Sequence, residues 1–290
     1  YMCAGVFCLT INDAIAKWLG ALYPIDVIVF FRMLFALPII VAVGLMIGGR
    51  RALATGKPLI HMGRGLLATC GTFSFFLGLT LLPLAEVTAI AFASPLFVTL
   101  IAIPLLGERP GPGQWIATVG GFGGVLLIVQ PGTEAFAIGA LAPLGTALFY
   151  ALLMLTARML GRRETIWATM LYATVVPLVI SGVLLPWFWK TPALEHLPWF
   201  MAAGLAGGVA MTLITQGFRI GVASVVAPFD YTGLVWAVAF GWMFWRETPS
   251  DMAIYGILVI VVCGIYLAYT HTRSEVRTTA PEPLHPPRGG

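Results

Sequence analysis

The sequence predicts an all-α integral membrane protein with ten transmembrane helices, arranged as a 5+5 inverted-topology repeat. Three observations predict this fold: an apolar composition, a series of long apolar runs and a weak internal repeat. Hydrophobic residues make up 59% of the 290 residues and charged residues only 10%, whereas a soluble domain carries about 25% charged residues. A soluble fold of this length would leave much apolar surface in water, so the expected solvent is lipid.

Ten apolar runs are separated by short breaks of Gly, Pro or charged residues. A run of about 20 apolar residues spans the hydrocarbon core of a bilayer, so each run is an expected helix. The expected ranges are 2–20, 24–47, 62–81, 85–106, 113–130, 137–160, 165–188, 197–218, 223–245 and 251–270. The segment 273–290 is polar and ends in a Pro-rich stretch, which predicts a disordered tail.

The Lys and Arg residues set the expected orientation. With a cytoplasmic N-terminus, 12 of the 16 fall in cytoplasmic segments, while 3 (Lys17, Lys190 and Arg246) fall outside and Arg32 lies within a helix. Positive charge concentrates in the cytoplasmic loops of membrane proteins. We therefore expect a multi-pass protein of the inner membrane with both termini in the cytoplasm.

An internal repeat divides the chain into halves of five helices, 1–132 and 133–272. GERP around Glu108 recurs as RETP around Glu247, so that Glu and Pro repeat at a shift of 139 residues (247 − 108 and 249 − 110). AKWLG (16–20) resembles ARMLG (157–161) at nearly the same shift. Because five is odd, the second copy enters the membrane from the opposite face, a plan typical of secondary transporters.

These features resemble the EamA type of the drug/metabolite transporter superfamily. The resemblance covers about residues 2–270, and GERPGPGQWIATVGGFGGVLLI (107–128) is its most specific stretch. The second copy departs from the motif, since Arg246 replaces its Gly. Within the family the chain is most similar to bacterial exporters of amino acids, including aromatic ones. The resemblance implies a central cavity lined by the first, third, fourth, sixth, eighth and ninth helices.

Charged residues within the first two helices are the first candidate site. Charges inside a bilayer are costly and need an explanation. Asp13 and Arg32 reach similar depth on antiparallel neighbouring helices, and Lys17 follows Asp13 by four residues on one helical face. Either Asp13 pairs with Arg32 or Lys17 to orient the helices, or Asp13 or Lys17 meets a substrate ammonium or carboxylate. In the second case Asn12 adds a neutral hydrogen-bonding contact.

Two helix interruptions mark further candidates. Ser94 precedes Pro95 in the fourth helix, and Asp230 follows Pro228 in the ninth. Proline removes a backbone hydrogen bond, and broken helices at matching positions in two halves point to a transporter site. The alternatives are a packing kink with Asp230 paired to Arg219 or Arg158 and, for Glu86, favourable charge at a helix N-terminus.

Aromatic and neutral polar residues complete the candidate set. A cavity for amino acids needs an apolar wall and a few fixed polar groups. The remaining candidates are Thr72, Phe73, Phe76, Tyr150, Gln216, Tyr231 and Trp236; the alternative for most of the aromatic ones is ordinary packing or contact with lipid. Glu108 and Glu247 each precede a Pro at a turn, and we expect both to stabilise the turn. Small residues in GGFGG (120–124) and AAGLAGGVA (202–210) predict close helix approach.

The sequence thus favours a secondary transporter that exports amino acids or related small metabolites by alternating access. A multidrug or nucleobase transporter of the same fold is the alternative, and a channel or a membrane enzyme is the alternative from another class. The four His residues lie at helix ends, in loops or in the tail, and the four Cys residues have no CxxC spacing. We expect no metal, no cofactor, no catalytic residue and no nucleic-acid partner. The expected partners are a small-molecule substrate and the lipid bilayer; the oligomeric state stays open, and the pattern is compatible with a monomer.

Overall fold

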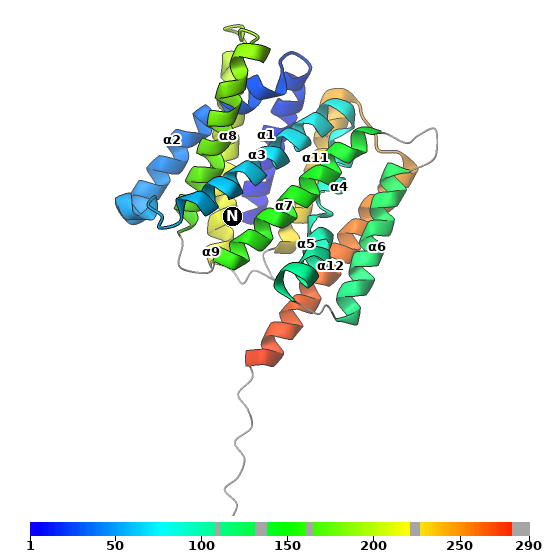
Figure 1. The fold of residues 1–290 in the computed structure, drawn as a ribbon. Helices are drawn as coiled ribbons and strands as arrows, with labels where there is room; N and C mark the ends of the chain where they lie inside the picture. Colours follow the sequence, from blue (N-terminus) through cyan, green and yellow to red (C-terminus); the bar gives the residue numbers. More distant parts are fainter. Residues whose placement is uncertain (108–110, 131–137, 161–164, 221–226, 280–290) are drawn as a thin grey trace, which may run out of the picture.

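The computed structural model describes residues 1–107, 111–130, 138–160, 165–220 and 227–279, and these segments contain helices but no strand. The helices form one bundle (Figure 1). Its α-helices are α1 Met2–Gly20, α2 Ile25–Ala52, α3 Pro58–Leu81, α4 Leu84–Ala91, α5 Ser94–Leu106, α6 Pro112–Val129, α7 Leu141–Leu160, α8 Ile166–Phe188, α9 Leu197–Ile220, α11 Thr232–Phe240 and α12 Asp251–Thr279. The 3₁₀ helices η1 (Ile138–Ala140) and η2 (Ala227–Tyr231) and the π-helix η3 (Gly241–Trp245) complete the set.

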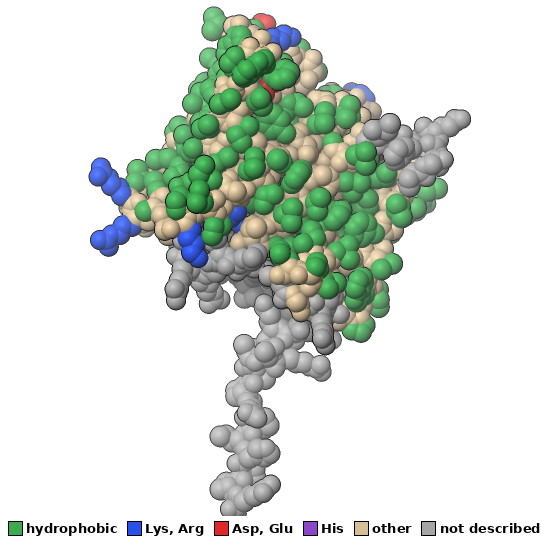
Figure 2. All heavy atoms as spheres, viewed as in Figure 1, with side chains coloured by type: hydrophobic (Ala, Val, Ile, Leu, Met, Phe, Trp, Pro, Cys, Tyr) green, Lys and Arg blue, Asp and Glu red, His purple; other side chains and the backbone are tan. Residues whose placement is uncertain are grey.

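Several helices are long enough and apolar enough to cross a membrane, judged by length and composition. There are 6 in the described residues: Met2–Gly20, Ile25–Ala52, Pro58–Leu81, Leu84–Leu105, Ile166–Phe188 and Leu197–Ile214. Figure 2 shows hydrophobic side chains spread over the flank of the bundle, with Lys and Arg side chains toward its two ends, more of them at the lower end of the view. An apolar flank with charge at its ends is the surface that a bilayer requires.

The predicted interruption of the fourth helix is present. The expected helix 85–106 appears as α4 and α5, which are separated by a short turn at Phe92 and Ala93. Pro95 lies in the first turn of α5, where its missing N–H costs nothing. The described part of the expected ninth helix, 223–245, is also irregular, because a 3₁₀ turn, a short α-helix and a π-helix follow one another there.

The last helix runs further than the sequence indicates. A tail was expected from residue 273, but α12 continues to Thr279, and residues 280–290 lie outside the described part. The extension has a local cause, because THTRSEVRTT contains no Gly or Pro and the first Pro comes at position 281.

Helix packing is extensive between elements far apart in sequence. The main pairs are α1 with α9, α3 with α7, α2 with α8 and α6 with α12; α2 also packs on α9, and α3 on α8. Figure 1 shows α6 and α12 side by side at one edge of the bundle. Glycines permit this contact, since a Cβ on Gly256 would lie 2.6 Å from the carbonyl oxygen of Gly124. The close approach predicted for GGFGG is therefore confirmed.

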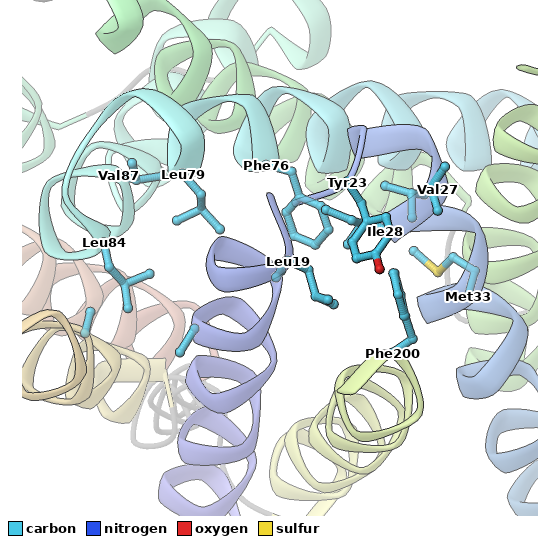
Figure 3. Close-up of a cluster of buried hydrophobic side chains, with 14 of the residues drawn as sticks. Leu19, Tyr23, Val27, Ile28, Met33, Phe76, Leu79, Leu84, Val87 and Phe200 are labelled. Carbon is cyan, nitrogen blue, oxygen red and sulfur yellow. The ribbon is translucent and has the colours of Figure 1, made fainter. Parts of the chain in front are cut away.

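One apolar core joins the first three helices to α9. Leu19, Val27, Ile28, Phe76 and Phe200 are all buried and point toward one another (Figure 3). This core holds α1, α2 and α3 in a fixed arrangement. The polar side chains of the candidate site lie on these same helices.

Candidate functional site

Asn12 and Asp13 form the polar centre of α1. Asn12 is fully buried, and its Nδ2 donates a hydrogen bond of 2.8 Å to Oδ1 of Asp13. Asp13 also interacts electrostatically with Arg32 on α2. The structure thus brings together the opposite charges that the sequence placed at similar depth.

Arg32 approaches this centre from α2. Its guanidinium carbon lies 5.2 Å from the centre of the Phe76 ring on α3, a cation–π contact. The ion pairs of the described residues do not include one between Arg32 and Asp13. The two side chains therefore attract each other across a distance longer than a salt bridge. Phe76, a candidate from the sequence, thus provides the aromatic ring on which the Arg32 guanidinium packs.

Lys17 is engaged elsewhere, and the alternative that paired it with Asp13 is wrong. Its ammonium lies 2.7 Å from both carboxylate oxygens of Glu247 and 3.1 Å from the carbonyl oxygen of Leu82. Spacing along α1 could not reveal this, because Glu247 is 230 residues away. In this structure the ammonium of Lys17 already has its partners, and a contact with substrate stays a prediction.

Glu247 was expected to stabilise its own turn, but the side-chain contacts that the structure describes for it reach α1 and α4 instead. The N–H of Leu84, at the start of α4, donates to Oε2 of Glu247 at 3.3 Å. Glu86 in the first turn of α4 interacts electrostatically with both Glu247 and Lys17. These groups form one charged cluster at the Gly20 end of α1. Glu108, the counterpart of Glu247 in the first half, lies outside the described residues.

Asp230 lies in a second polar region. Its carboxyl group interacts electrostatically with the hydroxyl groups of Tyr150 on α7 and Tyr231 in η2. The alternative pairs Asp230 with Arg158 or Arg219, whose side chains lie outside the described part of the chain. Asp230, in η2, thus lies near two of the predicted aromatic residues, Tyr150 of α7 and its neighbour Tyr231.

The aromatic candidates of the second half also pack against other rings. Tyr231 lies 5.4 Å from Phe92, centre to centre, and its hydroxyl abuts the backbone of Gly264 on α12. Trp236 meets Phe7 edge-on at 4.8 Å. These contacts agree with the packing alternative for Tyr231 and Trp236.

The other candidates are spread over several helices. Phe73 packs against the core of Figure 3, and Ser94 is buried at the start of α5. Thr72 and Gln216 are half-buried on α3 and α9. The structure gives these four side chains no common centre.

The sequence pattern does not reveal that one arginine, Arg64, is buried inside the bundle. Arg64 was counted among the cytoplasmic loop charges, but α3 begins at Pro58 and the Arg64 side chain is buried. Its Nη1 donates to the carbonyl oxygen of Leu153 at 2.7 Å and to the hydroxyl of Thr156 at 2.8 Å, both on α7. The hydropathy of the surrounding run gives no signal for this role.

Apolar helices of membrane-spanning length around buried charged side chains define a multi-pass membrane protein. Among the described residues, no group of three or more His, Cys, Asp or Glu side chains is placed to hold a metal ion. The chain belongs to the EamA-like transporter family, whose sequence model matches residues 1–130 and 137–270.

Three relatives carry transporter names. The chain is 28% identical to the S-adenosylmethionine uptake transporter of Rickettsia prowazekii, over 91% of this chain and 90% of the relative. It is 32% identical to the riboflavin transporter of Rhizobium johnstonii, over 84% and 80%. It is 27% identical to the pseudopaline exporter CntI of Pseudomonas aeruginosa, over 91% and 93%. The family and these names indicate a transporter of small metabolites rather than an enzyme.

A solved crystal structure has the same fold. The match has a TM-score of 0.66 and covers 94% of this chain and 97% of the other, at 20% identity. An identity this low establishes the architecture alone.

Proposed function

We propose that the protein is a secondary transporter that exports amino acids or related small metabolites across the bacterial inner membrane by alternating access. The observation that carries the proposal is the interior pair of opposite charges, Asp13 on α1 and Arg32 on α2, in a chain of a transporter family. Ionisable groups within membrane helices mark the paths of substrates and ions. Opposite charges held apart suit a substrate that is itself zwitterionic.

Alternating access in this proposal comes from two five-helix halves of inverted topology. The family match supports the division, because its two stretches, 1–130 and 137–270, are similar in length. Helix packing supports it as well. In the two halves, α1 corresponds to α7 and α3 corresponds to α9. The contact between α1 and α9 therefore has a counterpart in the contact between α7 and α3, and both are among the most extensive in the bundle. Inverted halves give two similar shapes that open to opposite sides of the membrane.

Asp230 is the proposed coupling group of the second half. It interacts electrostatically with two tyrosine hydroxyls, and it lies in η2, within the irregular segment that leads into α11. A carboxyl group in this setting can exchange a proton during the transport cycle. The proposal therefore assigns recognition to Asp13 and its neighbours, and proton coupling to Asp230.

Uptake of S-adenosylmethionine is the second candidate function. The observation that favours it is the similarity to the Rickettsia protein of that name, which covers nearly all of both chains. S-adenosylmethionine carries an α-amino and an α-carboxylate group, so both candidates require the same recognition chemistry. They differ in the direction of net transport and in the size of the group attached to that headgroup.

The test is counterflow in proteoliposomes loaded with unlabelled substrate. The external labelled compounds are a panel of amino acids, S-adenosylmethionine and riboflavin. Exchange of an amino acid supports the proposal, exchange of S-adenosylmethionine alone supports the second candidate, and exchange of neither overturns both. Asp13→Asn is compared with wild type and with Glu195→Gln, which removes an exposed carboxylate in the α8–α9 loop. Normal exchange by Asp13→Asn contradicts the assigned site.

Orientation is tested separately. Single cysteines introduced at residues 55 and 285 in a variant that lacks the four native cysteines are expected on the cytoplasmic side. Labelling of the two positions from opposite faces of the membrane contradicts the proposed topology.

A further inference from the structure

Two buried polar atoms without partners face the same glycine. The Oδ1 of Asn12 and the Nε of Arg32 are buried and have no hydrogen-bond partner. A Cβ placed on Gly207 of α9 would lie 3.4 Å from Oδ1 of Asn12 and 3.6 Å from Nε of Arg32. An acceptor from α1 and a donor from α2 thus converge on a position of α9 that lacks a side chain.

The orientation of the Asn12 amide is fixed by its neighbour. Its Nδ2 donates to the carboxylate of Asp13. Rotating the amide by half a turn would set its oxygen against that carboxylate, which accepts hydrogen bonds and cannot donate while it is ionised. Oδ1 therefore faces Gly207 as an acceptor, beside the donor from Arg32.

The cluster is electrically balanced but incomplete in its hydrogen bonds. Asp13 offsets the charge of Arg32 at long range, and the Phe76 ring covers the guanidinium. Neither contact uses a guanidinium N–H, and buried polar groups are normally hydrogen-bonded. If Asp13 and Arg32 formed a purely structural ion pair, a direct hydrogen bond between them would be expected. A ligand site instead leaves a donor and an acceptor unpaired for the ligand.

We propose that this cluster binds the α-amino-carboxylate group of the substrate, with the carboxylate on Arg32 and the ammonium on Asn12 and Asp13, seated against Gly207. A guanidinium presents N–H groups in a geometry that matches a carboxylate. An ammonium donates three hydrogen bonds, which Oδ1 of Asn12 and the Asp13 carboxylate accept. The inference rests on the proposed transport function and names its substrate class.

The glycine itself provides a test that leaves the fold intact. Both distances from the new Cβ of Gly207→Ala are ordinary van der Waals contacts, so the substitution fits without displacing a neighbour. The methyl group nevertheless occupies the space into which both polar atoms point. The matched control is Gly71→Ala, whose Cβ would lie 3.5 Å from Cβ of Phe149 and meet no polar atom.

The experiment measures how well unlabelled compounds compete in the counterflow assay. The paired competitors are L-phenylalanine with phenethylamine, and S-adenosylmethionine with its decarboxylated form; each pair differs only in the carboxylate. We expect wild type and Gly71→Ala to favour the carboxylate-bearing member of a pair by about tenfold or more, and Gly207→Ala to lose that preference. Arg32→Lys, which keeps the charge but not the planar fork, should lower it as well.

Any one of four outcomes overturns the inference. Equal competition by the two members of each pair in wild type removes the carboxylate from recognition. An unchanged preference in Gly207→Ala, or the same loss in Gly71→Ala, removes Gly207 from the site. Exchange of riboflavin without competition from any of these compounds overturns the inference while leaving the protein a metabolite transporter, because riboflavin has no α-amino-carboxylate group.

Discussion

The Lys17 ammonium lies 2.7 Å from both carboxylate oxygens of Glu247 and 5.3 Å from the centre of the Trp245 ring. This ion pair joins α1 to the turn that precedes α12, and the carbonyl oxygen of Leu82 and the N–H of Leu84 connect it to the α3–α4 turn. One charge pair therefore fastens three separate parts of the chain at the same end of the bundle. In the proposed alternating-access cycle, we expect this contact to break when that end opens.

Glu247→Gln is expected to destabilise the protein by about 1–3 kcal/mol, because it leaves the ammonium of Lys17 buried without its counter-charge. The expected loss is below that of a fully buried pair, since the Glu247 side chain is 26% exposed and that of Lys17 7%. Thermal unfolding in detergent measures the change. Glu195→Gln, at an exposed glutamate 3.7 Å from His196, should have almost no effect. Equal losses in the two variants would refute the prediction.

Gly256→Val is expected to destabilise the contact between α6 and α12 by about 1–3 kcal/mol, through overpacking. Even a Cβ added at this position would lie 2.6 Å from a side-chain carbon of Ile128. The same unfolding assay applies, with Gly123→Ala on α6 as the control. No atom lies within 4 Å of that added Cβ, so the control should be neutral or slightly stabilising. An unaffected Gly256→Val variant would mean that the two helices are not closely packed.

Tyr23→Phe is expected to loosen the α8–α9 loop. The hydroxyl of Tyr23 forms a 2.7 Å hydrogen bond with Nδ1 of His196 and accepts the N–H of Ala193 at 3.0 Å. Each bond contributes about 0.5–1.5 kcal/mol, and the phenylalanine keeps the ring contact with Phe200. Limited proteolysis of the loop reports the change. As a control, Tyr255→Phe changes an exposed tyrosine of α12 and should leave the cleavage rate as it is in wild type. If Tyr23→Phe also leaves the cleavage rate unchanged, the loop is held by packing alone and the prediction is wrong.

The sequence was sufficient for the local features of this fold. The extents of α1 and α8 follow from apolar runs and their breaks, and the division between α4 and α5 follows from the step Ser94–Pro95. The proximity of Asp13 and Arg32 could also be predicted, because a short loop makes α1 and α2 antiparallel neighbours and equal depth then follows from the helical rise.

Pairings between distant helices could not be predicted in this way. The partner of Lys17 depends on where the turn before α12 lies. Gly207 faces Asn12 and Arg32 only because α9 packs against both α1 and α2. The periodicity of a sequence indicates which face of a helix is buried, but not which other helix packs against that face. The same limit explains why Arg64 was read as a loop charge, although it donates hydrogen bonds to α7.

Asp230→Asn is expected to separate substrate exchange from proton coupling. Its carboxyl group interacts with the hydroxyl groups of Tyr150 and Tyr231, and none of the ion pairs in the described residues includes it. An amide of the same shape preserves the packing but cannot take up a proton. We therefore expect Asp230→Asn to retain counterflow, which needs no pH gradient, and to lose accumulation driven by an imposed pH gradient.

The control for this prediction is Glu86→Gln, which alters a carboxyl group beside Lys17 and Glu247. Because Glu86 belongs to the charged cluster at the Gly20 end of α1, its substitution should leave gradient-driven accumulation in place. Accumulation by Asp230→Asn at the wild-type level would exclude Asp230 as the coupling group. Loss in Glu86→Gln alone would instead move proton coupling to the cluster that contains the Lys17–Glu247 pair.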